Sequence, residues 1–160
     1  MNVAFTGHRP DKLGGYNDRT NKRSWFMTEI DKIIRGLGPD IEIISGMALG
    51  VDQWAAEYAA SKKIPFYAYV PFKGQECKWP SVSKAHYGLL LNMAKEVKYI
   101  CDSGYAPWKM QKRNEAMVDD CDLLIAVWNG APGGTENCIK YATGKKKIIR
   151  LDPLCITNNI

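Results

Sequence analysis

Short apolar runs alternate along the chain with longer segments whose apolar residues recur at helical spacing. The short runs are rich in β-branched and aromatic residues, as buried strands are, and lie at 3–6, 41–45, 66–70, 97–101, 122–128 and 147–151. The longer segments have the period of helices and lie at about 19–35, 50–62, 81–95, 109–120 and 135–143. This alternation predicts an α/β fold in one domain spanning 1–160, with a doubly wound, mostly parallel sheet and helices on both faces.

Three of the predicted strand ends lead into glycine-rich loops, at 7–15, 45–50 and 129–134. In open parallel sheets, ligands bind beyond the carboxyl ends of the strands. The helices that follow such loops present unpaired N–H groups and a positive dipole end, and glycines let a phosphate approach the backbone closely. We therefore expect these three loops to converge on one anionic ligand.

The candidate ligand-binding residues lie at these strand ends and on the helix at 109–120. His8 could donate a hydrogen bond to a phosphate or shuttle a proton, and Arg9 could clamp an anion. The whole set comprises Thr6, Gly7, His8, Arg9, Ser45, Gly46, Gly50, Asp52, Arg113, Trp128, Asn129, Gly133, Gly134, Thr135, Glu136 and Asn137.

Several of these residues also have ordinary structural interpretations, which the sequence leaves open. Asp52 could bind a ribose hydroxyl or cap its own helix. Trp128 could stack on a base or close the core, and Glu136 could simply favour a helix dipole. Gly46 and Gly50 could be no more than turn and packing glycines.

The composition narrows the class of protein further. The chain has 22 Lys and Arg against 17 Asp and Glu, which favours an anionic ligand only mildly. No stretch is apolar enough to span a bilayer, and the first strand leaves no room for a signal peptide, so we expect a cytoplasmic protein that enters no membrane. Five cysteines without a Cys-x-x-Cys pair and only two histidines indicate reduced thiols, with no metal and no cofactor.

The motifs, taken in order, resemble one family. Thr6-Gly7-His8-Arg9-Pro10 with LGGY at 13–16, SGMALGVDQWAAE from Ser45 and GGTENCIKYA from Gly133 are together similar to the YpsA-like branch of the SLOG superfamily. The resemblance covers nearly the whole chain and implies a Rossmann-like fold that recognises nucleotides or nucleotide-derived ligands. Some branches belong to nucleotide-signalling systems in conflict between bacteria and phage.

The LOG enzymes of this superfamily cleave the N-glycosidic bond of nucleoside 5′-monophosphates. The resemblance of the chain to these enzymes also implies a homodimer or higher assembly. Their signature is Met-x-x-Arg-Lys followed by Pro-Gly-Gly-x-Gly-Thr-x-x-Glu. Arg113, in Met110-Gln111-Lys112-Arg113-Asn114, matches the arginine, but Cys138 stands where the glutamate belongs and the loop is shorter. Glu136 is offset by one or two positions, which turns its side chain by roughly 100 to 200 degrees on a helix. Arg113 and Glu136 are therefore the catalytic candidates.

Three functional hypotheses follow. The leading one is binding of a phosphorylated nucleotide-derived small molecule, such as a mononucleotide, an ADP-ribose-type molecule or a cyclic nucleotide, for sensing or sequestration. The alternative is a LOG-like N-glycosidase. The third is DprA-like binding of single-stranded DNA, which ranks lowest because the sequence shows no basic stripe with interleaved aromatic residues. We expect a small molecule as the partner and do not expect nucleic acid.

Overall fold

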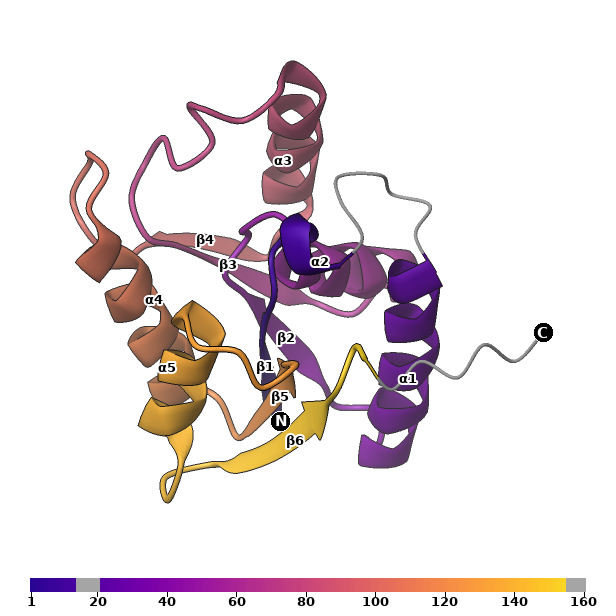
Figure 1. Ribbon diagram of the computed structural model, residues 1–160. Coiled ribbons are helices and arrows are strands. Elements are labelled where there is room, and N and C mark those ends of the chain that lie inside the picture. Colours follow the sequence, from indigo (N-terminus) through magenta and orange to yellow (C-terminus); the bar gives the residue numbers. More distant parts are fainter. Residues whose placement is uncertain (14–20, 155–160) are drawn as a thin grey trace.

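A computed structural model describes residues 1–13 and 21–154 of the 160-residue chain. Its strands pair in parallel throughout, in the order β4-β3-β2-β1-β5-β6 (Figure 1). They are β1 (Asn2–Gly7), β2 (Glu42–Ser45), β3 (Phe66–Val70), β4 (Glu96–Tyr99), β5 (Leu123–Val127) and β6 (Lys147–Leu151). The predicted Rossmann-like α/β fold is confirmed.

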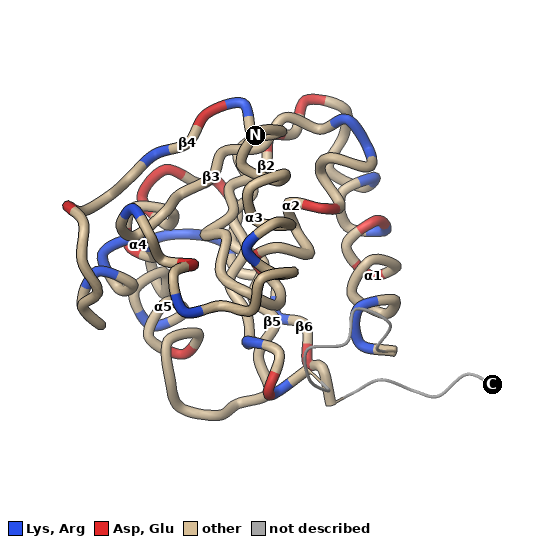
Figure 2. Tube along the Cα trace, turned by 90° about the horizontal axis from the view of Figure 1, so that it is seen from above, with Lys and Arg blue, Asp and Glu red and all other residues tan. Residues whose placement is uncertain are grey.

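Helices cover both faces of this sheet. In the described residues they are the short 3-10 helix η1 (Pro10–Lys12), α1 (Asn21–Leu37), α2 (Val51–Lys62), α3 (Ser81–Met93), α4 (Pro107–Asp120) and α5 (Gly134–Ala142). Figure 1 and the view from above in Figure 2 show α1 on one side of the molecule and α4 with α5 on the other. Helices α2 and α3 pack together on the side of α1.

Two cores hold the layers together, one on each face of the sheet. In β1, Val3 and Phe5 belong to the larger core with α1, whereas Ala4 belongs to the smaller core with α4 and α5. Successive side chains of a strand point to opposite faces. Thr6 therefore follows Ala4 toward α5, where its hydroxyl interacts with the thiol of Cys138.

The strand order reverses beside β1. From β1 the chain proceeds through β2 and β3 to one edge of the sheet, while β5 lies on the other side of β1 and leads into α5 on the opposite face. Diverging connections of this kind leave a crevice at the carboxyl ends of the two strands. The backbone amide of Asn129 donates to Nε2 of His8 at 2.9 Å, which joins the two strand ends at this point.

The element boundaries agree with the sequence pattern to within about two residues, as is usual for helix and strand ends. A difference lies in the first loop, where η1 forms because proline suits the first position of a helical turn. Residues 14–16 of the LGGY segment and a helix cap at Asn17 or Asp18 lie outside the described residues. None of the helices that the structure describes is both long and apolar enough to cross a membrane.

Candidate functional site

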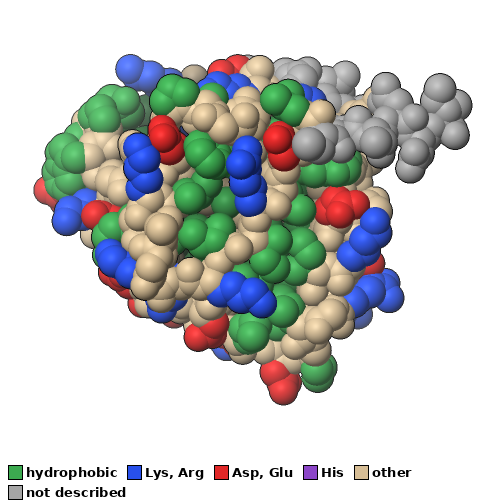
Figure 3. Space-filling view, turned by 60° about the horizontal axis from the view of Figure 1, so that its bottom comes forward, with side chains coloured by type: hydrophobic (Ala, Val, Ile, Leu, Met, Phe, Trp, Pro, Cys, Tyr) green, Lys and Arg blue, Asp and Glu red, His purple; other side chains and the backbone are tan. Residues whose placement is uncertain are grey.

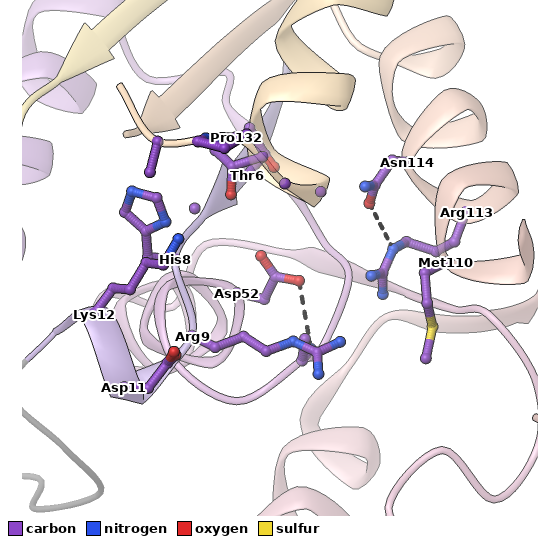
Figure 4. A pocket seen from close by; sticks show the side chains of 16 residues that line it. Thr6, His8, Arg9, Asp11, Lys12, Asp52, Met110, Arg113, Asn114 and Pro132 are labelled. Carbon is purple, nitrogen blue, oxygen red and sulfur yellow. Dashed lines mark hydrogen bonds between the residues drawn. The ribbon is translucent and has the colours of Figure 1, made fainter. Parts of the chain in front are cut away.

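A pocket of about 240 Å³ lies at the carboxyl ends of β1 and β5, where the strand order reverses (Figure 4). Its walls come from the end of β1, the start of α2, one side of α4 and the first turn of α5. We call it the polar pocket, and it is lined by Thr6, Gly7, His8, Arg9, Asp11, Lys12, Ala48, Asp52, Met110, Arg113, Asn114, Ala131, Pro132, Gly133, Gly134 and Thr135.

The first turn of α5 presents backbone donors to the polar pocket. Gly133 caps the helix at a φ of 143°, a conformation that side chains rarely adopt, and Gly134 and Thr135 follow it. Amides in the first turn of a helix have no intrahelical partner, and the helix dipole places partial positive charge there. This wall is therefore suited to hold an anion, as the glycine-rich sequence predicts.

Arg9 is an exposed cation of the pocket. Its side chain extends across the pocket below Asp52 and toward Met110, as Figure 4 shows. Within the described residues 1–13 and 21–154, no hydrogen bond or ion pair holds its guanidinium. Lys12 is a second exposed cation in the lining, beside the exposed carboxylate of Asp11. The guanidinium of Arg9 is thus free to bind a ligand.

Arg113 and Asp52 are buried charges, with 4% and 8% of their surfaces exposed. They meet at Gly46, where an added Cβ would lie 2.7 Å from both Nη1 of Arg113 and Oδ2 of Asp52. Burial raises the pKa of Asp52 and lowers that of Arg113, and in each case the partner's opposite charge counteracts the shift. The two groups therefore stabilise one another inside the protein.

Arg113 also makes hydrogen bonds within the protein that the sequence does not predict. Its Nη1 donates to the carbonyl oxygen of Gly46, and its Nε donates to Oδ1 of Asn114 at 2.8 Å. Asp52 in turn accepts a hydrogen bond from the amide of Ala48 at 3.4 Å. Arg113 thus ties α4 to the loop between β2 and α2, and only part of its guanidinium remains for a ligand.

His8 is a buried, neutral side chain. Burial, and then the nearby charge of Lys12, lower its pKa. Its Nε2 accepts the amide hydrogen of Asn129, which places the proton of the neutral ring on Nδ1. The sequence suggests that His8 donates a hydrogen bond to a phosphate or shuttles a proton. The N–H at Nδ1 can still act as a donor, whereas Nε2 already accepts the hydrogen bond that joins β1 to the end of β5.

Some of the predicted ligand residues do not line the polar pocket. The hydroxyl of Ser45 is buried and donates to the carbonyl oxygen of Asp52 at 2.6 Å. At Gly50 an added Cβ would lie 2.5 Å from the carbonyl oxygen of His8, so this glycine serves close packing. The indole of Trp128 donates to the carbonyl of Ala131 at 2.7 Å. Gly46 lies behind the buried charges, and Asn129 and Asn137 also fall outside the lining.

Glu136, the catalytic candidate, is also outside the lining of the polar pocket. Its carboxylate pairs with Lys140 one turn further along α5, at 3.1 Å. Cys138, which stands at the position of the LOG glutamate, is fully buried, and burial raises the pKa of its thiol to about 11. A thiol of this kind is protonated and inert at neutral pH. The carboxylates that do line the pocket are Asp11 and the buried Asp52.

The lining also includes residues that the sequence did not single out. Met110 and Asn114 lie within one helical turn of Arg113, so helical spacing from that arginine could have found them. The remainder belong to the three predicted glycine-rich loops but were not candidates individually, namely Asp11, Lys12, Ala48, Ala131 and Pro132.

A second cavity of about 570 Å³ adjoins the polar pocket. The two share Arg9, Ala48 and Met110. We call the second cavity the aromatic chamber, and the rest of its lining comprises Phe72, Lys73, Gly74, Gln75, Cys77, Lys78, Trp79, Gly104 and Tyr105. The sequence did not predict it, because its walls come from loops that are far apart along the chain.

Comparison with known proteins identifies the family of the chain. A family model named YpsA and described as the YspA SLOG family matches residues 3–151. The chain belongs to this SLOG family. It is 37% identical over 115 residues to the "Uncharacterized SPbeta prophage-derived protein YoqJ" of Bacillus subtilis (strain 168), covering 62% of the chain and 67% of YoqJ. It is 28% identical over 150 residues to a UPF0398 protein of Lysinibacillus sphaericus, covering 88% of the chain and 83% of that relative.

Solved structures share the fold of this SLOG chain. DNA processing protein A (DprA) of Streptococcus pneumoniae superposes with a TM-score of 0.66 at 18% identity, over 93% of the chain and 49% of DprA. DprA of Helicobacter pylori, described with a single-stranded DNA binding mode, also has a TM-score of 0.66, at 19% identity, over 94% of the chain and 64% of DprA. The chain thus spans about half of one DprA and less than two thirds of the other.

The fold shared with DprA contradicts the expectation that nucleic acid is not a partner of the chain. A protein with the same fold as this SLOG chain binds single-stranded DNA. The expectation relied on the absence of a basic stripe with interleaved aromatic residues in the sequence. In the folded chain, cationic Lys73 and Lys78 line the same cavity as Trp79 and Tyr105. Lys73, Lys78 and Trp79 are close together in the sequence, and folding brings Tyr105 to the same cavity.

Proposed function

We propose that the chain binds a phosphorylated nucleotide-derived small molecule, with a phosphate in the polar pocket, for sensing or sequestration. The ligand class is a mononucleotide, an ADP-ribose-type molecule or a cyclic nucleotide. The observation that carries this proposal is the uncommitted guanidinium of Arg9 in the same pocket as the first-turn amides of α5. An exposed cation and fixed backbone donors together form a common phosphate site.

The charges of the polar pocket support an anionic ligand. Its lining contains three cationic side chains, Arg9, Lys12 and Arg113, against two carboxylates, Asp11 and Asp52. Because Arg113 and Asp52 offset one another, the exposed cations and the α5 dipole decide the potential that a ligand meets. A phosphate is therefore attracted to the open side of the pocket.

Binding without cleavage fits the position of the acidic groups better than hydrolysis does. Glycosidic cleavage passes through a positively charged transition state that a nearby carboxylate stabilises. Glu136 is paired with Lys140 outside the lining of the pocket. The carboxylate of Asp52 is buried and accepts the amide hydrogen of Ala48 at 3.4 Å.

Isothermal titration with AMP, ADP-ribose and a cyclic dinucleotide tests the proposal. We expect one of the three to bind, and Arg9→Ala to weaken that binding by about tenfold or more, since a hydrogen bond to a charged group contributes about 1.5–3 kcal/mol. Arg35→Ala is the matched control, because Arg35 is an exposed arginine of α1 whose partner is Asp31. Folded protein that binds none of the three contradicts the proposal.

The same mixtures, examined by chromatography after long incubation, distinguish binding from cleavage. We expect the nucleotides to be recovered intact. Release of free base would show that the chain is an N-glycosidase. In that case Glu136→Gln measures whether this glutamate takes part in the reaction.

Single-stranded DNA is a second candidate ligand, favoured by the fold shared with H. pylori DprA. Exposed Arg9, Lys12, Lys73 and Lys78 line the polar pocket and the aromatic chamber, around the aromatic rings of the chamber. The opposite end of the molecule is different, because Figure 3 shows cationic and acidic side chains interspersed there. Phosphates of a single strand would follow the cationic rim while bases contact the rings.

Fluorescence anisotropy of a labelled oligothymidylate of 20 nucleotides tests this candidate. Binding should fall steeply as salt rises, because each neutralised phosphate releases counterions. The double variant Lys73→Ala/Lys78→Ala should weaken DNA binding and leave the binding of inorganic phosphate by the polar pocket unchanged, because neither lysine lines that pocket. Lys145→Ala/Lys147→Ala is the control, because these exposed lysines lie outside both cavities. Affinity that is absent, or independent of salt, removes this candidate.

A further inference from the structure

The aromatic chamber is a second cavity, and the proposed phosphate site in the polar pocket does not explain it. Its volume, about 570 Å³, lies within the range of small-molecule sites in proteins. Its lining includes the rings of Phe72, Trp79 and Tyr105 together with the thioether of Met110. Sites for small organic ligands combine apolar walls of this kind with a few polar groups.

The rings of the chamber differ in how firmly they are held. Phe72 is 3% exposed and meets Tyr105 edge to face, with 6.2 Å between the ring centroids. Trp79 meets the buried Tyr87 edge to face at 5.3 Å. Tyr105 is 70% exposed, so most of its ring surface is available for contact. An edge-to-face contact leaves the face of a ring open to another aromatic group.

Lys109 holds the segment that carries Tyr105. This lysine is only 6% exposed, and its Nζ donates to the carbonyl oxygens of Asp102, Ser103 and Gly104 at 2.9, 3.2 and 2.8 Å. Three hydrogen bonds from one buried cation restrain the loop immediately before the tyrosine. A restrained wall costs less conformational entropy when a ligand binds.

Gln75 supplies a polar group among the apolar walls. It is 9% exposed and lines the chamber, and its Nε2 donates to the hydroxyl of Tyr87 at 3.2 Å. The side-chain carbonyl oxygen therefore remains as an acceptor for a ligand. Nucleobases have both apolar faces and polar edges, so they match such a lining.

The chamber and the polar pocket adjoin one another, since Arg9, Ala48 and Met110 belong to both linings. A nucleotide has the same two-part design, with its charged phosphate joined to its flat base through one sugar. We propose that the aromatic chamber is a nucleobase subsite, in which the base stacks against Tyr105 and Trp79 while the phosphate occupies the polar pocket. This inference rests on the proposed function and adds the part of the ligand that the second cavity recognises.

The experiment compares AMP with ribose 5-phosphate, which has the phosphate and sugar but no base. Stacking of one base on aromatic side chains corresponds to about 5- to 150-fold in affinity. We expect AMP to bind more tightly than ribose 5-phosphate by a factor in this range. Tyr105→Ala should remove most of the difference by weakening AMP alone, whereas Arg9→Ala should weaken both ligands.

Tyr99→Ala is the matched control, because Tyr99 is a half-exposed tyrosine of β4 outside both cavities. Equal affinities of AMP and ribose 5-phosphate, or tighter AMP binding that Tyr105→Ala leaves unchanged, overturn the base subsite and leave the phosphate site standing. If the folded protein binds neither of these ligands, nor ADP-ribose, nor the cyclic dinucleotide, the proposed function itself fails. The two failures are thus distinguishable.

Discussion

The polar pocket and the aromatic chamber adjoin, yet they are built in different ways. The polar pocket contains charged side chains that are 4% and 8% exposed, and its backbone donors belong to a helix of the main fold. The chamber is formed largely by the loops that follow β3 and β4, and its tyrosine is 70% exposed. The polar pocket is therefore coupled to the stability of the protein, whereas the exposed Tyr105 of the chamber can change with little effect on folding.

The largest effect on stability should come from Arg113. Arg113→Met removes the hydrogen bonds to Gly46 and Asn114 and the positive charge near the buried Asp52, and leaving a buried polar group unsatisfied costs about 1–3 kcal/mol. We expect a loss of this size in the free energy of unfolding measured in urea. Arg35→Met, at a side chain that is 72% exposed, should change it by less than about 0.5 kcal/mol.

A double variant identifies the source of that loss. If the unpaired Asp52 charge is responsible, Arg113→Met/Asp52→Leu should recover a substantial part of the stability that Arg113→Met loses. If the double variant is as unstable as the single one, the hydrogen bonds that Arg113 makes to Gly46 and Asn114 are the main contribution.

A loss no larger than this should follow from Gly50→Ala at the start of α2. The glycine has a φ of 96°, and an added Cβ would lie 2.5 Å from the carbonyl oxygen of His8. Backbone strain of this kind should lower the free energy of unfolding, measured with heat or urea, by about 1–3 kcal/mol. Gly88→Ala, within α3 and with open space around it, should instead stabilise the protein by about 0.5–1 kcal/mol. Equal effects at both glycines would contradict the close packing inferred at Gly50.

The pH dependence of stability tests the role of His8. Burial lowers its pKa below the ordinary 6.5, so below that pH the unfolded chain takes up a proton that the folded chain does not. The wild-type protein should therefore lose stability relative to His8→Gln as pH falls from 7 to 5. Glutamine keeps an acceptor for the amide of Asn129 but does not titrate. Parallel stability curves for the two proteins would show that His8 is not held in its neutral form.

The smallest effect on stability should come from the chamber. Tyr105→Ala should change the free energy of unfolding by less than about 0.5 kcal/mol, as is usual for exposed side chains. The same variant is expected to weaken AMP binding markedly. A stability loss above about 1 kcal/mol would show that this ring is part of the folded core, and the contrast between the two cavities would then fail.

Parts of the candidate site were predictable because their signals are local. Thr6 to Arg9 follow an apolar strand directly, and Gly133 to Thr135 occupy a glycine turn before a helix, so each segment indicates its own position at a strand end. Arg113 was found through a motif, but its commitment to Gly46, 67 residues away, depends on how α4 packs. Glu136 was a candidate because it stands near the place of the LOG glutamate, whereas only the structure shows that it lies outside the lining of the pocket.

By itself, the sequence determined the alternation of strands and helices, the parallel sheet and the family, because apolar periodicity and short motifs are properties of neighbouring residues. The tertiary structure alone decided which charges are buried, which glycines serve packing and where the aromatic chamber lies. The physical reason is that burial and convergence depend on contacts between segments far apart in the chain. Phe72, Trp79 and Tyr105 form one cavity only after β3 and β4 lie side by side.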